Sequence, residues 1–332
     1  MPEIKTALHA PELGPGAWIQ GPELSLRFAR GAVVLVDFWE ATCVNCLRTL
    51  PYLKAWHERY SDKGLAVVGV HAPEYEFGRS REVVAEAVRA EGIPYRVLLD
   101  AEYETWQRFA NKFWPAEYLV DARGYLRYEH AGEGAYGETE EWIQRLLREA
   151  GFAGELPPPL APLRPEDAPG AVCQRPTPEL QLGFHRGRNA SPEGYRPGQE
   201  VEHRAGAERH PPLGMFLLRG RWRHEAEYLE TAAPDAELEL HCEAVDVNLV
   251  AEGPGETALS VPAADAPADL PLPVHERGAD VVARDGSSVA LWQRTQMVRL
   301  IAGESFARRR LRLRFARSGQ RVYAFSFTGC VR

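Results

Sequence analysis

The sequence predicts an α/β domain followed by an all-β sandwich domain, and three observations support this prediction. The chain has 332 residues, which exceeds the size at which a single hydrophobic core keeps growing. In its first half, apolar runs that suit buried strands alternate with segments of helical periodicity. In its second half, short runs of alternating polar and apolar residues are separated by glycine, proline and aspartate. We therefore expect two domains of different class.

The first half begins with two apolar, β-branched runs that are typical of strands buried on both faces. They are VVLVDFW at 33–39 and LAVVGVH at 65–71. Between them, apolar residues recur at helical spacing from Leu47 to Tyr60, and Gly64 supplies a stop signal. These elements form one βαβ unit, so we expect a largely parallel central sheet.

Further elements continue the same alternation up to residue 149. Helices are expected at 79–91, 103–111 and 138–149, and strands at 95–100, 117–121 and 125–131. The last two strands are separated by the turn sequence Asp121-Ala122-Arg123-Gly124. We therefore expect them to pair as a hairpin.

The second half shows no long helical pattern. Its alternating runs begin with MFLLRGRW and end with RVYAFSF, and turn residues separate them. Between residues 238 and 249, the apolar residues shift from even to odd positions, as a bulge or strand corner would require. A β-sandwich with a jelly-roll-like arrangement fits this pattern best.

A proline-rich stretch marks the boundary between the two halves. Residues 152–178 carry many prolines and little periodicity, which is typical of a semi-rigid linker or of a segment that wraps a domain. We assign residues 1–152 to the first domain, 153–171 to a proline-rich linker and 172–332 to the β-sandwich domain.

Composition and charge exclude several classes of function. The net charge of −8 argues against nucleic acid as a partner, because phosphate backbones are bound by clustered lysine and arginine. No stretch approaches 18 apolar residues and the first residues lack the pattern of a signal peptide, so the sequence predicts a cytoplasmic protein without a membrane span. The five cysteines are an odd number and do not resemble a disulfide framework, which suits a reducing compartment.

The strongest chemical signal is Cys43-Val44-Asn45-Cys46, which lies directly after the first buried strand and at the start of the next helix. Backbone N–H groups and the dipole at a helix N-terminus favour an anion, so we expect Cys43 to be held partly as thiolate. Cys46 lies one turn further along, where it can attack a mixed disulfide formed by Cys43. We interpret the pair as a redox-active disulfide, with Cys43 as nucleophile and Cys46 as resolving residue.

A metal half-site is the alternative interpretation of this pair. A structural zinc site needs two more ligands at suitable spacing, and the sequence around Cys43 and Cys46 supplies none. Cys173, Cys242 and Cys330 are remote in the sequence, and their state is left open. We therefore expect no metal.

The run VDFWEATCVNC at residues 36–46 resembles the strand and active site of the thioredoxin superfamily. The resemblance implies a thioredoxin-like first domain and dithiol–disulfide exchange with protein substrates, without a cofactor. Asp37 matches the buried carboxylate that assists proton transfer to and from the resolving cysteine, and a carboxyl in such a strand should have a raised pKa. Trp39 matches the aromatic residue beside the active site and is expected to contribute to substrate binding. Pro51 falls where the family's active-site helix is kinked.

The superfamily also has a cis-proline loop that faces the two cysteines. Trp114-Pro115 precedes the strand EYLVD and occupies that place, so the resemblance implies that Pro115 is cis. Trp114 should then lie beside Cys43 and shape the surface that receives a substrate disulfide. His57 and His71 are expected to be structural residues.

Within the superfamily, VVGVHAPEYEF and the insert at 79–100 resemble the TlpA-like branch, and almost the whole chain is similar to the soluble portion of DipZ-type proteins. RNASPEGYRPGQ and VDVNLVAEG carry this resemblance into the second half, where that family has a β-sandwich likened to carbohydrate-binding modules. DipZ-type proteins usually have a transmembrane electron-relay domain ahead of these two domains. The resemblance therefore allows an extracytoplasmic location, and it leaves the protein substrate and the electron donor unidentified.

The alternative function is that of a ligand- or glycan-binding protein whose β-sandwich carries the main role. Trp222 and Trp292 could stack on sugars, although core packing is the commoner role of such residues. The run from Arg308 to Phe315 puts arginines on one strand face, which suits a solvated face or a site for anions and acidic sugars.

The direction of electron flow at the cysteine motif is not indicated by Val44 and Asn45, the two residues between the cysteines. We favour a disulfide reductase.

Overall fold

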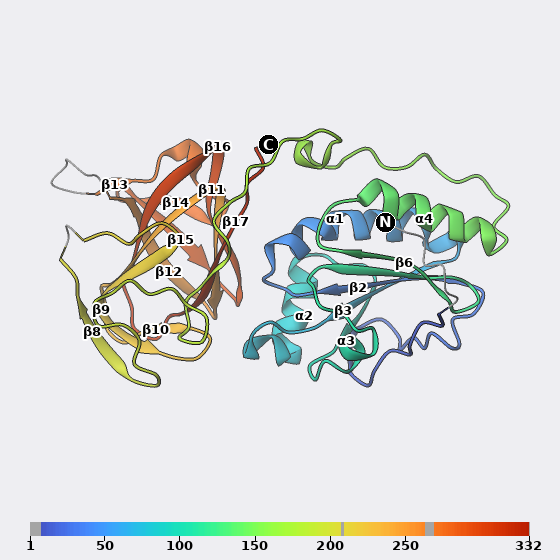
Figure 1. Cartoon of the computed structure of the whole chain (residues 1–332), viewed down its shortest axis with the longest axis horizontal. Coiled ribbons are helices and arrows are strands. Elements are labelled where there is room, and N and C mark those ends of the chain that lie inside the picture. Colours follow the sequence, from blue (N-terminus) through green and yellow to red (C-terminus); the bar gives the residue numbers. More distant parts are fainter. Residues whose placement is uncertain (1–7, 207–208, 263–268, 332) are drawn as a thin grey trace. The chain divides into compact units, whose positions relative to one another are not determined.

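The computed structural model describes residues 8–206, 209–262 and 269–331, and the chain divides into two compact units (Figure 1). The first unit covers Met1–Ala168 and the second covers Pro169–Arg332. The first unit combines helices and strands around a central sheet, whereas the second is built mainly from strands. Each unit has hydrophobic core clusters of its own.

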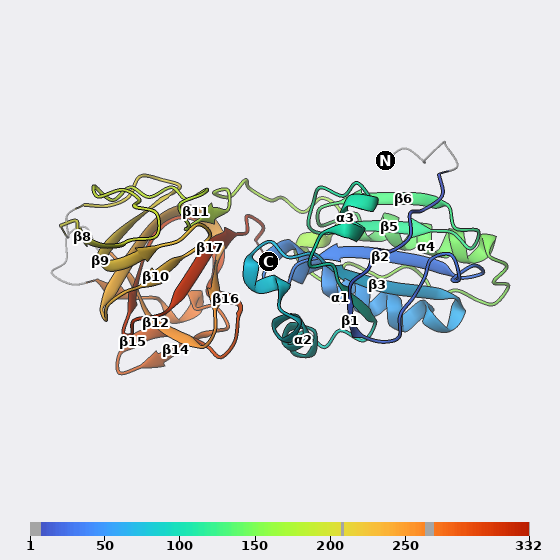
Figure 2. The same ribbon diagram turned by 90° about the horizontal axis from the view of Figure 1, so that it is seen from below.

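A six-stranded sheet with the order β1-β4-β3-β2-β5-β6 forms the centre of the first unit (Figure 2). Its strands are β1 (Ala17–Gln20), β2 (Val33–Trp39), β3 (Leu65–His71), β4 (Arg96–Leu99), β5 (Ala116–Val120) and β6 (Leu126–Ala131). Strands β2, β3 and β4 are parallel, and the β5–β6 hairpin and β1 attach to them antiparallel. The sheet is therefore mixed, which corrects the expectation of a largely parallel sheet.

Helices cover both faces of this sheet (Figure 1). The helices are α1 (Val44–Tyr60), α2 (Arg81–Ala90), α3 (Glu104–Arg108) and α4 (Tyr136–Glu149). Apolar residues of α1, α2 and α4 share a core cluster with one face of the sheet, and the other face packs against α3 and the chain before β2. Every residue of β2 is buried as a result. Pro51 lies inside α1, as the resemblance implies.

The proline-rich stretch after α4 lies along the first unit. The N–H of Leu160 donates to the buried carboxylate of Glu140 at 2.7 Å, and the N–H of Leu163 donates to Tyr52 Oη at 2.7 Å. Tyr52 Oη in turn donates to Asp167 Oδ2 at 2.8 Å, within the short 3-10 turn Pro165–Asp167. Of the two interpretations of this stretch, the structure favours the wrapping segment over the linker.

The described residues of the second unit form a single hydrogen-bonded system of eleven strands. They are β7 (Leu180–Gln181), β8 (Glu200–Arg204), β9 (Met215–His224), β10 (Leu229–Thr231), β11 (Ala236–Glu252), β12 (Gly255–Val261), β13 (Leu270–Pro271), β14 (Val281–Arg284), β15 (Ser287–Trp292), β16 (Gln296–Phe315) and β17 (Arg321–Phe327). Hydrogen bonds link β11 to β17, β17 to β10, β10 to β9, and β9 back to β11. The unit is thus β-rich and partly closed on itself, and its description as a jelly-roll-like sandwich stays a prediction.

Two long antiparallel strands, β11 and β16, form the spine of this unit. They pair from Ala236 opposite Phe315 to Ala251 opposite Gln296. The register shifts between Ala244 and Asp246, where the sequence changes its apolar phase, so the pairing is irregular at the place where the sequence predicts a bulge or strand corner. The chain stays within β11 at this point, so the runs that the sequence separates belong to one strand.

A disulfide between Cys173 and Cys330 closes the second unit, with Cα atoms 4.2 Å apart and a sequence separation of 157 residues. The sequence analysis left the state of Cys173 and Cys330 open, and the structure shows them to be bonded. The total of five cysteines is odd because Cys43, Cys46 and Cys242 are free thiols, so the count does not indicate this disulfide. The disulfide joins the beginning of the second unit to its end.

Replacing Cys173 and Cys330 together by serine should lower the free energy of unfolding of the second unit by about 2 to 5 kcal/mol, because the open chain regains loop entropy. Urea unfolding monitored by hydrogen exchange of β11 and β17 peptides measures this change. Added dithiothreitol should destabilise the second unit of the wild type and leave that of the double variant unchanged. Equal stability of both proteins without reductant would contradict the structural role of this disulfide.

Candidate active site

The two cysteines of the motif lie where β2 passes into α1. Cys43 is the N-cap residue of α1, and its Sγ accepts a hydrogen bond from the N–H of Cys46 at 3.3 Å. Cys43 is half-buried, whereas Cys46 is 1% exposed and belongs to the core cluster beneath α1. One thiol is therefore accessible to a partner, and the other lies behind it.

Burial raises the pKa of the Cys46 thiol well above its ordinary value. The hydrogen bond with Cys43 and the negative charges of Cys43 and Asp37 raise the same pKa further, while a backbone hydrogen bond from Glu40 lowers it. Cys46 therefore holds its proton at neutral pH. If Cys46 is to act as a nucleophile, a nearby group has to accept this proton.

Asp37 is the carboxyl group beneath the cysteines that the sequence predicts. It lies in β2 with 1% of its surface exposed, and its two oxygens have no hydrogen-bond partner in the part of the chain that the structure describes. Burial raises the pKa of Asp37 well above the ordinary aspartate value, and the charge of Glu117 raises it further. The expected raised pKa of Asp37 is thus found.

Glu117 is a second buried carboxyl group, and the sequence analysis missed it. It lies on β5 directly opposite Asp37, and its Oε2 accepts a hydrogen bond from Thr139 Oγ1 at 3.0 Å. Burial raises the pKa of Glu117 to about 7. A glutamate among the apolar residues of EYLV, two positions after Pro115, was the available signal.

Glu40 and His71 support the loop between β2 and α1. The Glu40 carboxylate accepts hydrogen bonds from the Thr42 N–H at 2.6 Å and the Thr42 hydroxyl at 2.7 Å, and burial raises the pKa of Glu40 to about 7. His71 Nε2 accepts the N–H of Ala41 at 3.2 Å, and burial lowers the pKa of His71 to about 3. His71 is therefore a neutral structural residue, as expected, and Glu40 is a third buried carboxyl that the sequence analysis missed.

The aromatic residues expected at the substrate surface occupy different environments. Trp39 is 1% exposed and packs edge-on against His71 with ring centroids 5.1 Å apart, so it supports the site from the core and offers no surface to a substrate. Trp114 is half-buried, donates from Nε1 to the Ala72 carbonyl at 3.0 Å and packs against the same core cluster as Cys43. The bond between Trp114 and the buried Pro115 is cis.

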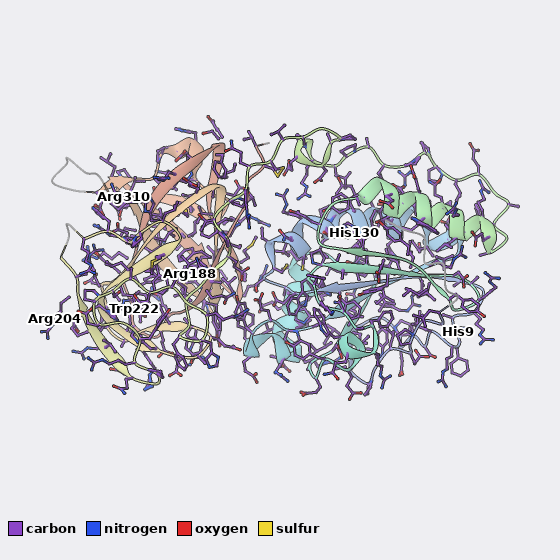
Figure 3. All side chains as sticks on the ribbon, viewed as in Figure 1. His9, His130, Arg188, Arg204, Trp222 and Arg310 are labelled. Atoms are coloured by element: carbon purple, nitrogen blue, oxygen red, sulfur yellow. A yellow bond between two sulfur atoms is a disulfide. The ribbon has the colours of Figure 1, made fainter. Side chains whose placement is uncertain are left out.

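The candidate ligand residues of the second unit are buried or paired. Trp222 (Figure 3) and Trp292 lie in the hydrophobic core, so neither presents a ring face to a sugar. Three arginines of the predicted arginine face on β16 form ion pairs with carboxylates of neighbouring chain segments. These ion pairs are Arg308–Glu243, Arg312–Glu239 and Arg314–Asp235. The protein itself thus pairs these three arginines, which favours the interpretation as a structural strand face.

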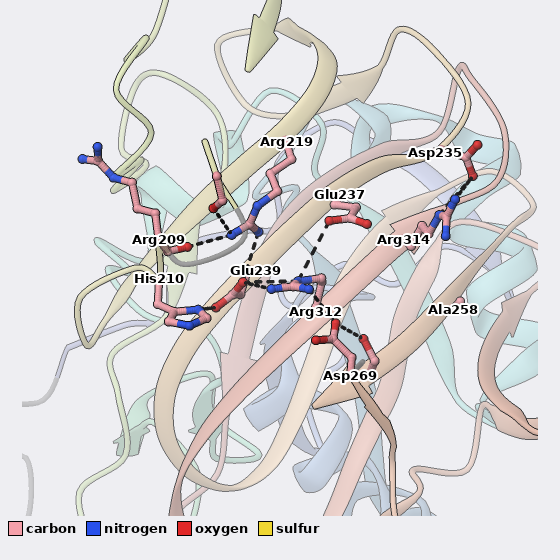
Figure 4. A network of polar contacts seen from close by, with 12 residues as sticks. Arg209, His210, Arg219, Asp235, Glu237, Glu239, Ala258, Asp269, Arg312 and Arg314 are labelled. Atoms are coloured by element: carbon pink, nitrogen blue, oxygen red, sulfur yellow. Dashed lines mark hydrogen bonds and ion pairs between the residues drawn. The ribbon is translucent and has the colours of Figure 1, made fainter. Parts of the chain in front are cut away.

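Glu239 is the centre of this polar network (Figure 4). Its carboxylate is fully buried and accepts hydrogen bonds from Arg312, Arg219 and His210 at 2.8, 3.1 and 2.6 Å. Burial alone would raise the pKa of Glu239, but the hydrogen bonds from Arg312 and His210 offset this effect and lower it. The network therefore holds strands β9, β11 and β16 together through a charged group.

A buried histidine pair links β8 to β9. His224 Nδ1 accepts the N–H of Arg196 at 3.0 Å, so His224 Nε2 carries the proton that bonds to His203 Nε2 at 3.0 Å. His203 Nδ1 then donates to Glu193 Oε2 at 3.1 Å. This chain of hydrogen bonds is complete with both rings neutral, and burial lowers the pKa of His224 to about 4.

No group of three or more histidine, cysteine, aspartate or glutamate side chains within residues 8–206, 209–262 and 269–331 could hold a metal ion. None of the helices described is both long enough and apolar enough to cross a membrane.

Comparison with known proteins identifies both halves of the chain. Residues 16–143 match the family described as Redoxin, and residues 177–328 match the family described as Thioredoxin like C-terminal domain. Protein DipZ of Mycobacterium tuberculosis is 37% identical over 290 residues, which cover 85% of this chain and 40% of DipZ. The chain thus spans about two fifths of the length of that relative.

Two shorter proteins match the first half of the chain. Thiol-disulfide oxidoreductase YkuV of Bacillus subtilis is 29% identical over 147 residues, covering 44% of this chain and 99% of YkuV. A thiol-disulfide isomerase structure from Corynebacterium glutamicum has 23% identity and a TM-score of 0.39, and it covers 42% of this chain and 96% of its own.

Alkylation of the reduced protein by iodoacetamide at neutral pH should modify Cys43 at least about tenfold faster than Cys46 or Cys242, because thiolate and exposure control the rate. Cys46 is buried, and burial also raises the pKa of Cys242 to about 12. Mass spectrometry of peptides at several reaction times measures the three rates. In guanidinium the three should react alike, and equal rates in the folded protein would contradict this description of the site.

Acid should destabilise the second unit through its histidine pair. Because the pKa of His224 in the folded protein lies below its ordinary value of 6.5, stability is fully present above about pH 6.5 and is lost as the pH falls towards about 4, by roughly 3 kcal/mol. Hydrogen exchange of β8 and β9 peptides across this range measures the loss. His224→Gln should flatten the dependence, whereas His275→Gln, at an exposed histidine of the same unit, should leave it unchanged.

Proposed function

This chain belongs to the thioredoxin superfamily and is a homologue of DipZ, and from this premise we propose that it is a thiol–disulfide oxidoreductase that acts on protein disulfides through Cys43 and Cys46. The observation that carries the proposal is the pairing of an accessible thiol at the N-terminus of α1 with a buried thiol one turn later. This arrangement separates the residue that meets the substrate from the residue that releases it.

The reaction follows from the positions of the two thiols. The Cys43 thiolate attacks one sulfur of the substrate disulfide, forms a mixed disulfide and leaves the other substrate sulfur as a thiolate. Cys46 then loses its proton and attacks Cys43 Sγ, so that the first substrate sulfur leaves and Cys43 and Cys46 become oxidised. Asp37 is the proposed acceptor of the Cys46 proton, since it is buried beside this thiol and its charge affects the thiol's pKa.

The charges around the motif support reduction of substrates as the direction of reaction. Three carboxyl groups are buried in this part of the unit: Asp37, whose charge acts on Cys46, Glu40, whose carbonyl accepts the N–H of Cys43, and Glu117, which faces Asp37. Negative charge there disfavours thiolates, and strongly oxidising members of this class depend on a stabilised reduced form. We expect the protein to deliver electrons to substrate disulfides and to receive them from an unidentified donor.

The surface around Cys43 and Trp114 is the proposed contact area for substrates. Trp114 is held by its hydrogen bond to Ala72 and by Trp106, whose ring centroid lies 4.4 Å away. Pro115 follows directly before β5 and fixes the adjoining backbone. Trp39 has no part in this surface, because it is buried.

The second unit bears on where the protein acts. Structural disulfides persist in oxidising compartments, so the Cys173–Cys330 bond supports an extracytoplasmic location over the cytoplasmic one that the sequence predicts. A glycan-binding role for this unit receives no support from Trp222 and Trp292, which are in the core. We propose that the second unit serves the redox reaction as a scaffold or docking domain.

A redox titration of Cys43 and Cys46 in defined thiol–disulfide buffers, read by alkylation and mass spectrometry, tests the proposed function. A reductase should show a reversible couple near about −270 mV, and a value near about −120 to −180 mV would instead indicate an oxidant or isomerase. Cys43→Ser should abolish exchange, and Cys46→Ser should accumulate a mixed disulfide between Cys43 and the substrate. Absence of a reversible couple would overturn the assignment.

A further inference from the structure

Asp37 and Glu117 form a pair of facing carboxyl groups in the core of the first unit. They lie directly opposite each other on the neighbouring antiparallel strands β2 and β5. Opposite residues of such strands point to the same face, with Cβ atoms about 5 Å apart. Each is only 1% exposed, so both groups are withdrawn from solvent.

The pair is connected to the redox motif on one side and to α4 on the other. The negative charge of Asp37 acts on the Cys46 thiol of α1. Glu117 Oε2 accepts a hydrogen bond from Thr139 of α4, and the Thr139 hydroxyl also lies 3.2 Å from Tyr128 Oη. Asp37 is therefore coupled both to the resolving thiol and to Glu117.

No cation balances the two carboxyl groups among the residues that the structure describes. The titratable groups that act on the pair from the packed elements are Cys46 of α1, Tyr95 before β4 and Tyr128 of β6. Gly69 stands opposite Asp37 on β3 and brings no side chain. Two buried carboxyl groups without a cation do not both ionise readily, so one of them keeps a proton.

We propose that Asp37 and Glu117 share one proton and together form the proton store that serves Cys46, an inference that rests on the proposed function. The shared proton gives the pair one negative charge. When Cys46 resolves the mixed disulfide, its S–H bond breaks and Asp37 takes the proton, while the proton that Asp37 held passes to the Glu117 carboxylate, so that the pair becomes neutral. The Cys46 sulfur bonds to Cys43 Sγ, the bond from Cys43 to the substrate sulfur breaks, and the substrate leaves as a thiolate that takes a proton from water. The cysteine pair is oxidised, the substrate disulfide is reduced, and the carboxyl pair later returns its extra proton to water.

The electrostatics of the pair agree with this division of roles. Burial raises the pKa of both groups, but Thr139 donates a hydrogen bond that favours the Glu117 carboxylate. Glu117 therefore ionises first, and its charge raises the pKa of Asp37. Asp37, the member beside Cys46, exchanges its proton at a pH that Glu117 sets. Glu117 is thus a positioning residue for the proton and not a group that touches the substrate.

A carboxyl titration tests the pairing without relying on activity. The full chain labelled with carbon-13 at the aspartate and glutamate carboxyl groups is titrated by NMR as wild type, Glu117→Gln and Glu129→Gln. Glu117→Gln removes the facing charge and should lower the midpoint of Asp37 by about one pH unit or more. Glu129→Gln removes an exposed carboxyl of β6 and should leave that midpoint unchanged. An unchanged Asp37 midpoint in Glu117→Gln would overturn the proposal.

The pH dependence of the resolution step connects the pair to the reaction. A mixed disulfide between Cys43 and a small aromatic thiol is prepared, and release of that thiol by Cys46 is followed at several pH values. Glu117→Gln should move the midpoint of this rate profile to lower pH, and Asp37→Asn should slow the step at least about tenfold. A uniform change of rate at every pH would mean that Glu117 has only a structural role and would refute the shared proton.

A milder variant guards against loss of folding. Thr139→Val keeps the shape of the side chain and removes the hydrogen bond to Glu117, so the Glu117 midpoint should rise. If the wild type shows no reversible redox couple of Cys43 and Cys46 but the carboxyl titration still shows the pairing, the proposed function is refuted and the pairing of Asp37 and Glu117 is not. An active wild type whose Asp37 and Glu117 titrate independently would refute only the shared proton.

Discussion

The burial of strand β2 is the constraint on which the first unit depends. Helices or chain segments cover both of its faces, and its six apolar residues are each worth about 1.5 to 3 kcal/mol when fully buried. This apolar burial offsets the cost of placing Asp37 in the same strand. The end of β2 also fixes where α1 begins, and with it the position of Cys43.

The chemistry beneath the motif follows from this geometry. Because β2 lies in the middle of the sheet, its inward side chains meet those of β5 under α1 and α4. Asp37 and Glu117 therefore face each other, each only 1% exposed, while Glu40 is held by the loop that leads to the cysteines. The surroundings of Cys46 are consequently buried and rich in carboxyl groups. The reactivity of Cys43 and Cys46 therefore depends on proton transfer as much as on the two sulfur atoms.

The sequence predicted the features that local patterns encode. The buried strand, the helix after it, the cysteine pair, the β5–β6 hairpin and the irregular pairing near residue 245 all follow from residues close together in the chain. The burial of Glu117 was not predicted, because it depends on α4, and its partner Asp37 lies on a strand eighty residues earlier in the chain.

The dependence on long-range contacts also explains the other differences between the sequence predictions and the structure. The contact of Trp39 with the core depends on His71 of the neighbouring strand, so the motif alone suggested a surface position. The Cys173–Cys330 disulfide joins residues that no local pattern connects. The three free cysteines make the total number of cysteines odd, so the count gave no indication of a disulfide. Strand direction at the sheet edges likewise depends on long-range pairing, which apolar runs do not specify.

The disulfide gives the second unit a property that its strands alone lack. Since Cys173 and Cys330 lie at its two ends, the chain between them is a covalent ring. A protease that cuts once inside this ring leaves both fragments joined and both held in the fold. A unit of this kind tolerates nicking in its surface loops, and its separation into pieces requires a reductant as well as a protease.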